Sequence, residues 1–151
     1  MDISGTLAKM EEIERKASRF YQRNHAKFQH DSEAARVFLE MQIEENRHAG
    51  LVRELRKRVE EAPELFARAD IPEKRFVKIL AVLEMELSSM EQLSLEETLN
   101  VAVNLECALS EGYLADLHTE SDSTLRDLCR ALGDKNHIET ITAFRKKRIG
   151  C

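Results

Sequence analysis

Apolar residues recur along most of the chain at spacings of three, four and seven, the period of an amphipathic α-helix. One such segment covers residues from about 3 to 28, and a second, capped by Asp31 or Ser32, continues to about residue 61. The inward stripe of the second segment is Ala34, Phe38, Met41, Glu45, His48, Val52, Leu55 and Val59. Its opposite face is predicted to face solvent and carries Glu40, Glu44, Arg47, Glu54 and Arg58. No sheet-like alternation appears, so the sequence predicts an all-α fold.

Two prolines, Pro63 and Pro72, interrupt the helical pattern, because proline lacks the amide hydrogen that a helix interior needs. They lie in a connection of about residues 62–93, which contains one extra helix over about 73–91. The apolar stripe of this helix is Phe76, Leu80, Leu83, Leu87 and Met90. Because the stripe is surplus to the main helices and needs a surface to cover it, we expect a homodimer.

The second half of the chain, about residues 94–148, predicts another pair of helices. Ser94 and Glu97 have the form of a capping box, which begins a helix that continues to about residue 118. A polar loop leads to a last helix, ending near residue 148, whose inward positions are Ala131, Asp134, His137, Ile141 and Phe144. We therefore expect one domain, residues 1–151, in which a helix pair occurs twice, at about 3–61 and 94–148.

Acids, tyrosines and histidines occupy inward positions in the same order in both halves. In the first helix of each pair an acid precedes a tyrosine by seven positions, and in the second an acid precedes a histidine by three. The acid–tyrosine pairs are Glu14–Tyr21 and Glu106–Tyr113, and the acid–histidine pairs are Glu45–His48 and Asp134–His137. This internal repeat would place two like halves about a pseudo-two-fold axis.

Four carboxylates in an apolar interior would repel one another and lose their hydration, so they need neutralising partners. Two divalent cations would supply the opposite charge, and oxygen donors with two imidazoles suit iron or manganese, with zinc also possible. We predict a dinuclear centre whose ligands are Glu14, Glu45, His48, Glu106, Asp134 and His137. Tyr21 and Tyr113 are either core aromatics or hydroxyls that hydrogen-bond a ligand carboxylate and help to supply an electron. The alternative is a helical bundle with neutralised polar residues, or one that has lost its metal.

The segments that carry these residues resemble the ferritin-like superfamily and, within it, the rubrerythrin-like group. They are IERKASRFYQ and FLEMQIEENRHAGLVREL in the first half, and LNVAVNLECALSEGYLADL and LRDLCRALGDKNHIETI in the second. The resemblance covers the chain except about residues 62–93 and the tail. It implies an antiparallel four-helix bundle around a non-haem di-iron centre, bridged by Glu45 and Asp134, that reacts with peroxide or dioxygen.

Three features depart from the rubrerythrin pattern. Leu109 stands where many rubrerythrins carry an extra carboxylate, and Asp134 is one methylene shorter than the usual glutamate. A rubredoxin-like four-cysteine domain is absent from the sequence, so electrons would come from a separate donor. Ferroxidase activity or iron handling, and a non-enzymatic helical interaction module with a degenerate site, are the alternative functions; a hydroxylase on the same fold is a further option.

Two glycines, Gly50 and Gly133, lie inside predicted helices beside the acid–histidine pairs. A glycine in a helix interior costs about 1 kcal/mol relative to alanine. Close approach of a neighbouring helix would explain both.

Composition and charge restrict the partners. The formal net charge is −5 with acids and bases interleaved, which argues against nucleic acid as a partner. The basic run 145–148 suits the negative end of a helix dipole. Cys107, Cys129 and Cys151 form no C-x-x-C pair, which is typical of reduced thiols. With no membrane-span pattern and no signal peptide visible, we expect a cytoplasmic protein without a membrane partner.

Overall fold

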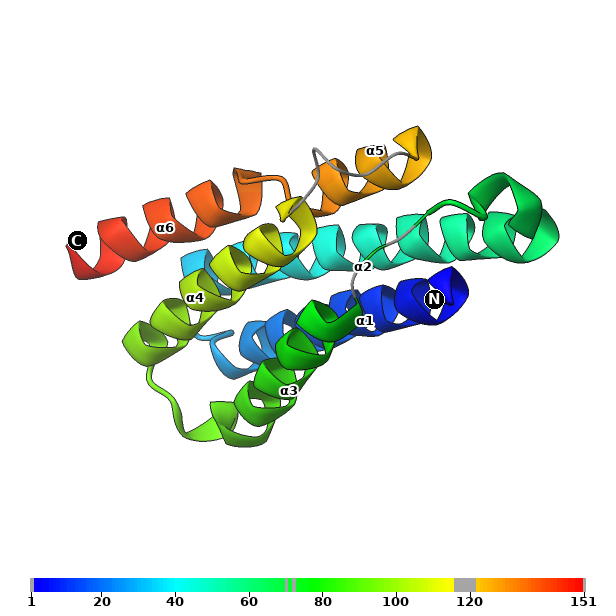
Figure 1. The fold of residues 1–151 in the computed structure, drawn as a ribbon. Coiled ribbons are helices and arrows are strands. Elements are labelled where there is room, and N and C mark those ends of the chain that lie inside the picture. The colour runs from blue at the N-terminus through cyan, green and yellow to red at the C-terminus, as the bar shows by residue number, and fades with distance from the viewer. Residues whose placement is uncertain (1, 70, 72, 116–121, 151) are drawn as a thin grey trace.

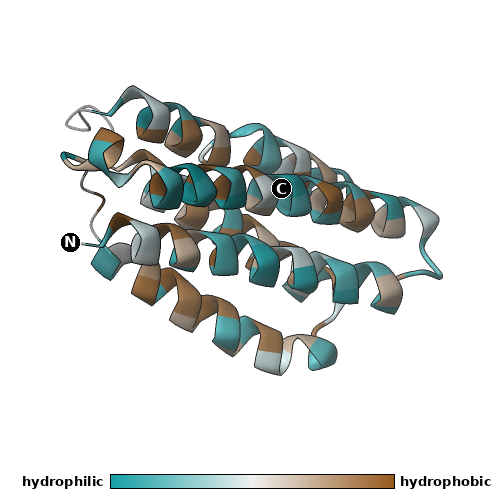
Figure 2. Ribbon diagram, turned by 90° about the vertical axis from the view of Figure 1, so that its right-hand side faces the viewer, coloured by the Kyte–Doolittle hydropathy of each residue, from teal (hydrophilic) through white to brown (hydrophobic). Residues whose placement is uncertain are grey.

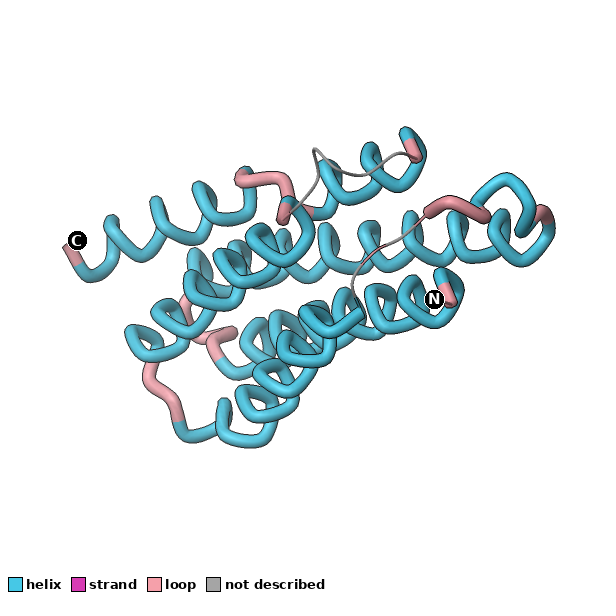
Figure 3. Tube along the Cα trace, in the orientation of Figure 1, coloured by secondary structure: helices cyan, strands magenta, loops and turns pink. Residues whose placement is uncertain are grey.

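Every regular element in the computed structural model is helical, across the residues that it describes, 2–69, 71, 73–115 and 122–150 (Figure 3). The elements in chain order are α1 (Ile3–Lys27), α2 (Ser32–Glu61), the 3-10 helix η1 (Pro63–Phe66), α3 (Glu73–Ser89), the 3-10 helix η2 (Met90–Gln92), α4 (Leu95–Leu114), α5 (Ser123–Leu132) and α6 (Asn136–Ile149). The predicted all-α class is confirmed. Among these described helices, none is both long and apolar enough to cross a lipid bilayer.

Local hydrogen bonds begin the helices where the sequence predicts them. Asp31 accepts a hydrogen bond from the amide of Ala34 at 3.1 Å, which caps α2. Ser94 and Glu97 form the predicted capping box of α4, with bonds of 2.8 and 3.2 Å. These caps fix where each helix starts, and thereby which side chains its inner face presents.

The helices pack in two layers (Figure 1). Helices α1 and α2 run antiparallel and pack along most of their length, and α4 packs against α5 and α6 beside them. Helix α3 packs against α1 and α4, at the edge of the molecule away from α5 and α6. Each helix carries both hydrophobic and hydrophilic residues (Figure 2), and every α-helix contributes buried hydrophobic residues to one core cluster. That cluster surrounds the polar residues described below.

The apolar stripe of α3 is covered by the chain's own helices. Phe76, Leu83 and Met90 are fully buried, and Leu80 and Leu87 are partly buried against the same core. The stripe was the reason for expecting a homodimer, and that reasoning is wrong because α1 and α4 already cover it. The dimer itself stays a prediction without this support.

The last predicted helix is in fact two helices, α5 and α6, separated at residues 133–135. Gly133 ends α5, where its amide donates to the carbonyl of Cys129 at 2.9 Å. A Cβ at Gly133 would lie 2.6 Å from Cγ of Leu114 in α4, so any larger residue would force the side chain of Leu114 or the helices to shift. Gly50 has nothing within 4 Å of the same position, so close approach explains Gly133 and is wrong for Gly50.

Candidate metal centre

Five of the six predicted ligands converge between the two layers of helices: Glu14 on α1, Glu45 and His48 on α2, Glu106 on α4, and His137 on α6. The three glutamates and His48 are at most 4% exposed, and the side chain of His137 is 12% exposed. Their donor atoms form two overlapping groups, each within 4.8 Å, and Glu45 belongs to both. Helices far apart in sequence thus bring together a set that the repeat pattern predicts.

The carboxylate of Glu45 lies between the two imidazoles. Its Oε1 is 2.8 Å from Nδ1 of His137, and its Oε2 is 3.7 Å from Nδ1 of His48. The imidazole rings stack with their centroids 4.9 Å apart. Glu14 approaches His48 to 3.3 Å, and Glu106 approaches His137 to 3.5 Å. Each histidine therefore has a glutamate of its own and shares Glu45 with the other.

The two tyrosines tie the halves together. The hydroxyl of Tyr21 donates to Oε1 of Glu106 at 2.5 Å, and the hydroxyl of Tyr113 donates to Oε1 of Glu14. Each tyrosine therefore holds the glutamate of the opposite half. Burial, together with the neighbouring glutamates, raises the pKa of both tyrosines well above its ordinary value, so they stay protonated donors. Both rings lie in the hydrophobic core and both hydroxyls hydrogen-bond a carboxylate, so the two interpretations offered by the sequence hold together in geometry. A role in supplying an electron stays a prediction.

Electrostatics shows how costly this cluster is without cations. Burial, and then the charge of Glu45, raise the pKa of Glu14 and Glu106. Burial acts on Glu45 in the same direction, but its polar contacts with Glu14 and the two histidines lower its pKa below the usual range. Burial opposes the charging of the histidines, yet their glutamate partners raise the pKa of His48 to about 9 and that of His137 to about 10. Protons therefore balance the charge that metal ions would otherwise balance.

Three buried polar atoms of the cluster lack a hydrogen bond of acceptable geometry among the described residues: Oε2 of Glu14, Oε1 of Glu45 and Nδ1 of His48. Buried polar atoms in folded proteins almost always have a partner, so each of these three requires an explanation. A donor set of carboxylate oxygens and imidazole nitrogens suits iron, manganese or zinc. The residues present thus fit a divalent metal pair.

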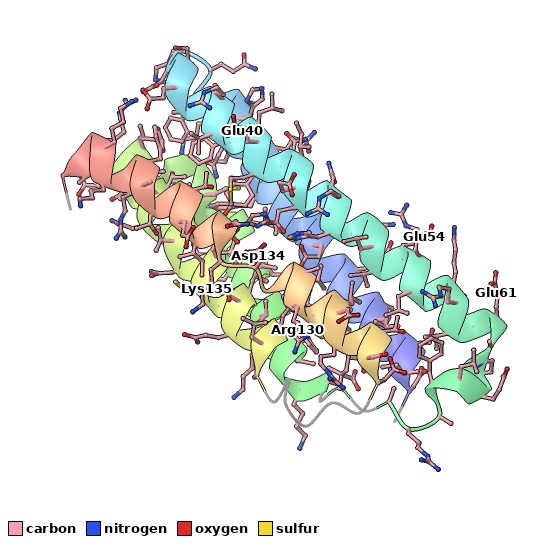
Figure 4. All side chains as sticks on the ribbon, turned by 90° about the horizontal axis from the view of Figure 1, so that it is seen from above. Glu40, Glu54, Glu61, Arg130, Asp134 and Lys135 are labelled. Atoms are coloured by element: carbon pink, nitrogen blue, oxygen red, sulfur yellow. The ribbon has the colours of Figure 1, made fainter. Side chains whose placement is uncertain are left out.

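The sixth predicted ligand, Asp134, lies outside the cluster. It is exposed at the junction between α5 and α6 (Figure 4), and its carboxylate accepts hydrogen bonds of 3.0 Å from the amide and from the side chain of Asn136. The inward orientation predicted for Asp134 is wrong, because the prediction assumed one continuous helix. The sequence GDKN at 133–136 carries turn-forming residues, which was the available signal of a break.

Glu44 is the acid that the sequence reasoning missed. It was assigned to the solvent face of α2, yet its carboxylate lies within 4.8 Å of donor atoms of both His48 and His137. A pocket of about 430 Å³ borders this group, and Asp134 also lines it. The available signal was the spacing of four between Glu44 and His48, which places both on neighbouring parts of one helix face.

No family model, no curated protein and no solved structure matches the chain.

Proposed function

We propose that the chain binds two divalent metal ions, iron foremost, and acts as a non-haem di-iron oxidoreductase that reduces peroxide or dioxygen. The observation that carries this proposal is the buried carboxylate of Glu45, which lies between two stacked imidazoles that each have a further glutamate. A carboxylate shared in this way would contribute to the binding of both ions. A bundle without a metal site would have no need of three acids in one buried cluster, because burying carboxylates together is costly.

The internal repeat supports a ferritin-like architecture. In this proposal α1, α2, α4 and the α5–α6 pair form the four-helix bundle, and α3 is the extra helix of the connection. The reciprocal bonds of Tyr21 with Glu106 and of Tyr113 with Glu14 are the contacts that a pseudo-two-fold relation would produce. Glutamates on two helices, with acid-x-x-His motifs on the other two, are the ligand set of ferritin-like di-iron proteins. Here the second motif contributes only its histidine.

The residues around the site would control an oxygen reaction in definite ways. A bound ferrous pair would supply the two electrons that cleave an O–O bond. Tyr21 and Tyr113 hold the orientation of Glu106 and Glu14. His48 and His137 would give up a proton if they bound a metal ion. The pocket borders both imidazoles, so oxidant would enter there, and electrons would arrive from a separate donor.

Ferroxidase activity is the second candidate function. The pocket that leads to His48 and His137 is also lined by the carboxylates of Glu40, Glu44 and Asp134, of which Glu40 pairs with Arg36 and Glu44 with Arg47. An acidic mouth attracts divalent cations, which favours iron both as substrate and as resident metal.

The test is metal binding under anaerobic conditions. Protein loaded with Fe²⁺ and freed of excess ion should retain two ions per chain, and His48→Ala should retain markedly less. His30→Ala, which changes an exposed histidine outside the cluster, is the control and should retain two. Optical spectra after addition of oxygen and then of peroxide distinguish the two oxidants. A chain that retains no stoichiometric metal is a helical module with a degenerate site, and the proposal then fails.

A further inference from the structure

If the cluster bound two divalent ions, its carboxylates would supply one negative charge too few to neutralise them. Glu14, Glu45 and Glu106 contribute three negative charges, whereas two such ions bring four positive charges. Asp134, the expected fourth acid, is exposed and bonded to Asn136. An uncompensated charge in a buried site is unfavourable, so a fourth carboxylate near the two imidazoles would stabilise the loaded state.

Glu44 is in position to supply that carboxylate. It is half-buried at the pocket, and donor atoms of Glu44, His48 and His137 lie within 4.8 Å of one another. Arg47 donates two hydrogen bonds to it, at 3.0 and 2.9 Å, and both end on Oε2. Among the described residues Oε1 accepts none, so Arg47 orients the carboxylate while leaving one oxygen for a ligand.

A second observation at the same pocket points to a cation. His48 lines the pocket and is 2% exposed, and its Nδ1, which faces Glu14 at 3.3 Å, has no hydrogen bond of acceptable geometry among the described residues. Adjacent residues on an α-helix project about 100° apart. Glu45 therefore approaches the imidazoles from inside the bundle, and Glu44 approaches them from the pocket.

We propose that Glu44 is a ligand of the dinuclear centre on its pocket side, in the place that Asp134 leaves open. This inference rests on the proposed metal centre and adds an asymmetry to it. Helix α2 would then provide the two carboxylates, Glu44 and Glu45, that each lie near both imidazoles. The second half would provide only Glu106 and His137. Arg47 is a positioning residue, which holds Glu44 through Oε2.

Cobalt binding tests the inference without any measurement of activity. Co²⁺ is titrated anaerobically into the wild type and into Glu44→Gln, with stoichiometry read by equilibrium dialysis and coordination read from the visible absorption bands. We expect the wild type to bind two ions. Because even loss of a residue that only supports a ligand weakens metal affinity about 10–100-fold, Glu44→Gln should weaken at least one ion by about 10-fold or more and change its bands.

Two variants with the same change of charge serve as controls. Glu40 lines the same pocket one turn earlier on α2, where it pairs with Arg36 at 2.8 Å, and Asp134 lines the pocket from the other side. Glu40→Gln and Asp134→Asn should keep the affinity and the bands of the wild type. Weakening of equal size in all three variants would reveal a general effect of charge, and would overturn the ligand role of Glu44.

The remaining outcomes separate this inference from the proposed function. If the wild type binds two ions and Glu44→Gln matches it in affinity and bands, the inference is overturned while the metal centre stands. If Asp134→Asn alone weakens binding, the α5–α6 junction rearranges in the loaded protein, and Glu44 is again excluded. If the wild type binds no Co²⁺, both proposals fall. Thermal unfolding of Glu44→Gln monitored by circular dichroism checks that the variant is folded.

Discussion

The two halves of the molecule share a pattern of acids, tyrosines and histidines but differ in one backbone feature. In the first half, α2 continues unbroken through Glu45 and His48, and both side chains point into the core. In the second half, the chain leaves the helix between α5 and α6, and only His137 reaches the cluster while Asp134 is exposed. An acid three residues before a histidine shares its face only while the helix is continuous.

The break also decides where the site is open. His48, on the continuous helix, is 2% exposed, and the side chain of His137, just after the break, is 12% exposed. The pocket lies between α2 and the α5–α6 junction, where a continuous helix would carry an inward acid. The first half therefore contributes the more deeply buried side chains of the cluster, and the break in the second half lies beside the pocket.

The largest expected effect compares the matched acids Glu45 and Asp134. Glu45→Gln should reduce the metal content from two ions to fewer than one per chain, because this carboxylate contacts both imidazoles. Asp134→Asn should retain two ions. Elemental analysis after dialysis measures both. Equal losses in the two variants would mean that the halves are equivalent in the loaded protein, contrary to the comparison.

Local signals account for what the sequence predicts well. The caps at Asp31 and at Ser94 with Glu97 use hydrogen bonds within four residues, so the sequence contains all the partners. The inward stripes likewise predict the burial of Glu14 and Glu45, because helical period depends only on spacing.

Competing local hydrogen bonds and packing between distant helices account for what the sequence predicts badly. The stripe through Asp134 has the right period, but Asp134 and Asn136 bond each other locally and so favour a turn over a continuing helix. Glu44 was assigned to solvent because its spacing from His48 shows only that both lie on one part of α2, and not that His137 of α6 lies beside them. The stripe of α3 was read as surplus for the same reason, since α1 and α4 cover it only in three dimensions.

The next comparison concerns the reciprocal tyrosines. Tyr21→Phe and Tyr113→Phe each leave a buried glutamate oxygen without its donor, so each should lower the free energy of unfolding by about 1–3 kcal/mol. The pKa of Glu106 should rise in Tyr21→Phe, because that hydrogen bond lowers it. Denaturant unfolding of metal-free protein measures the stabilities, and the double variant should be the least stable. If one tyrosine proved dispensable, the two halves would not brace each other equally.

The glycines near the two acid–histidine pairs should respond in opposite directions. Gly133→Ala places a methyl against Leu114, and overpacking of this kind costs about 1–3 kcal/mol. Gly50→Ala meets no atom within 4 Å, so the lower backbone entropy of the unfolded chain should stabilise the protein by about 0.5–1 kcal/mol. Thermal unfolding of both variants measures the difference. If Gly133→Ala stabilised the protein instead, the α5–α6 junction or Leu114 would have to shift at little cost to make room for the methyl group.

A surface contact joins the two halves at the other end of α6. Arg148, in the last turn of α6, donates two hydrogen bonds to the carboxylate of Asp31, which also caps α2 through the amide of Ala34. The bonds from Arg148 and then from Ala34 lower the pKa of Asp31 from its ordinary value of 3.8 to about 2. The contact is exposed, so its contribution to stability is small.

The smallest expected effect is the pH dependence of this contact. Because the folded-state pKa of Asp31 lies below its unfolded value, its contribution to stability is complete above about pH 4 and is lost as the pH falls toward 2. Asp31→Asn should therefore be less stable than the wild type at pH 6, and the difference should shrink between pH 4 and pH 2. Denaturant unfolding at several pH values measures it, with Arg148→Gln as the control that keeps the cap on Ala34. If the stability difference between the wild type and Asp31→Asn stayed constant down to pH 2, the effect of Asp31 would not come from its charge. The ion pair between the end of α6 and the start of α2 would then not stabilise the contact between the halves.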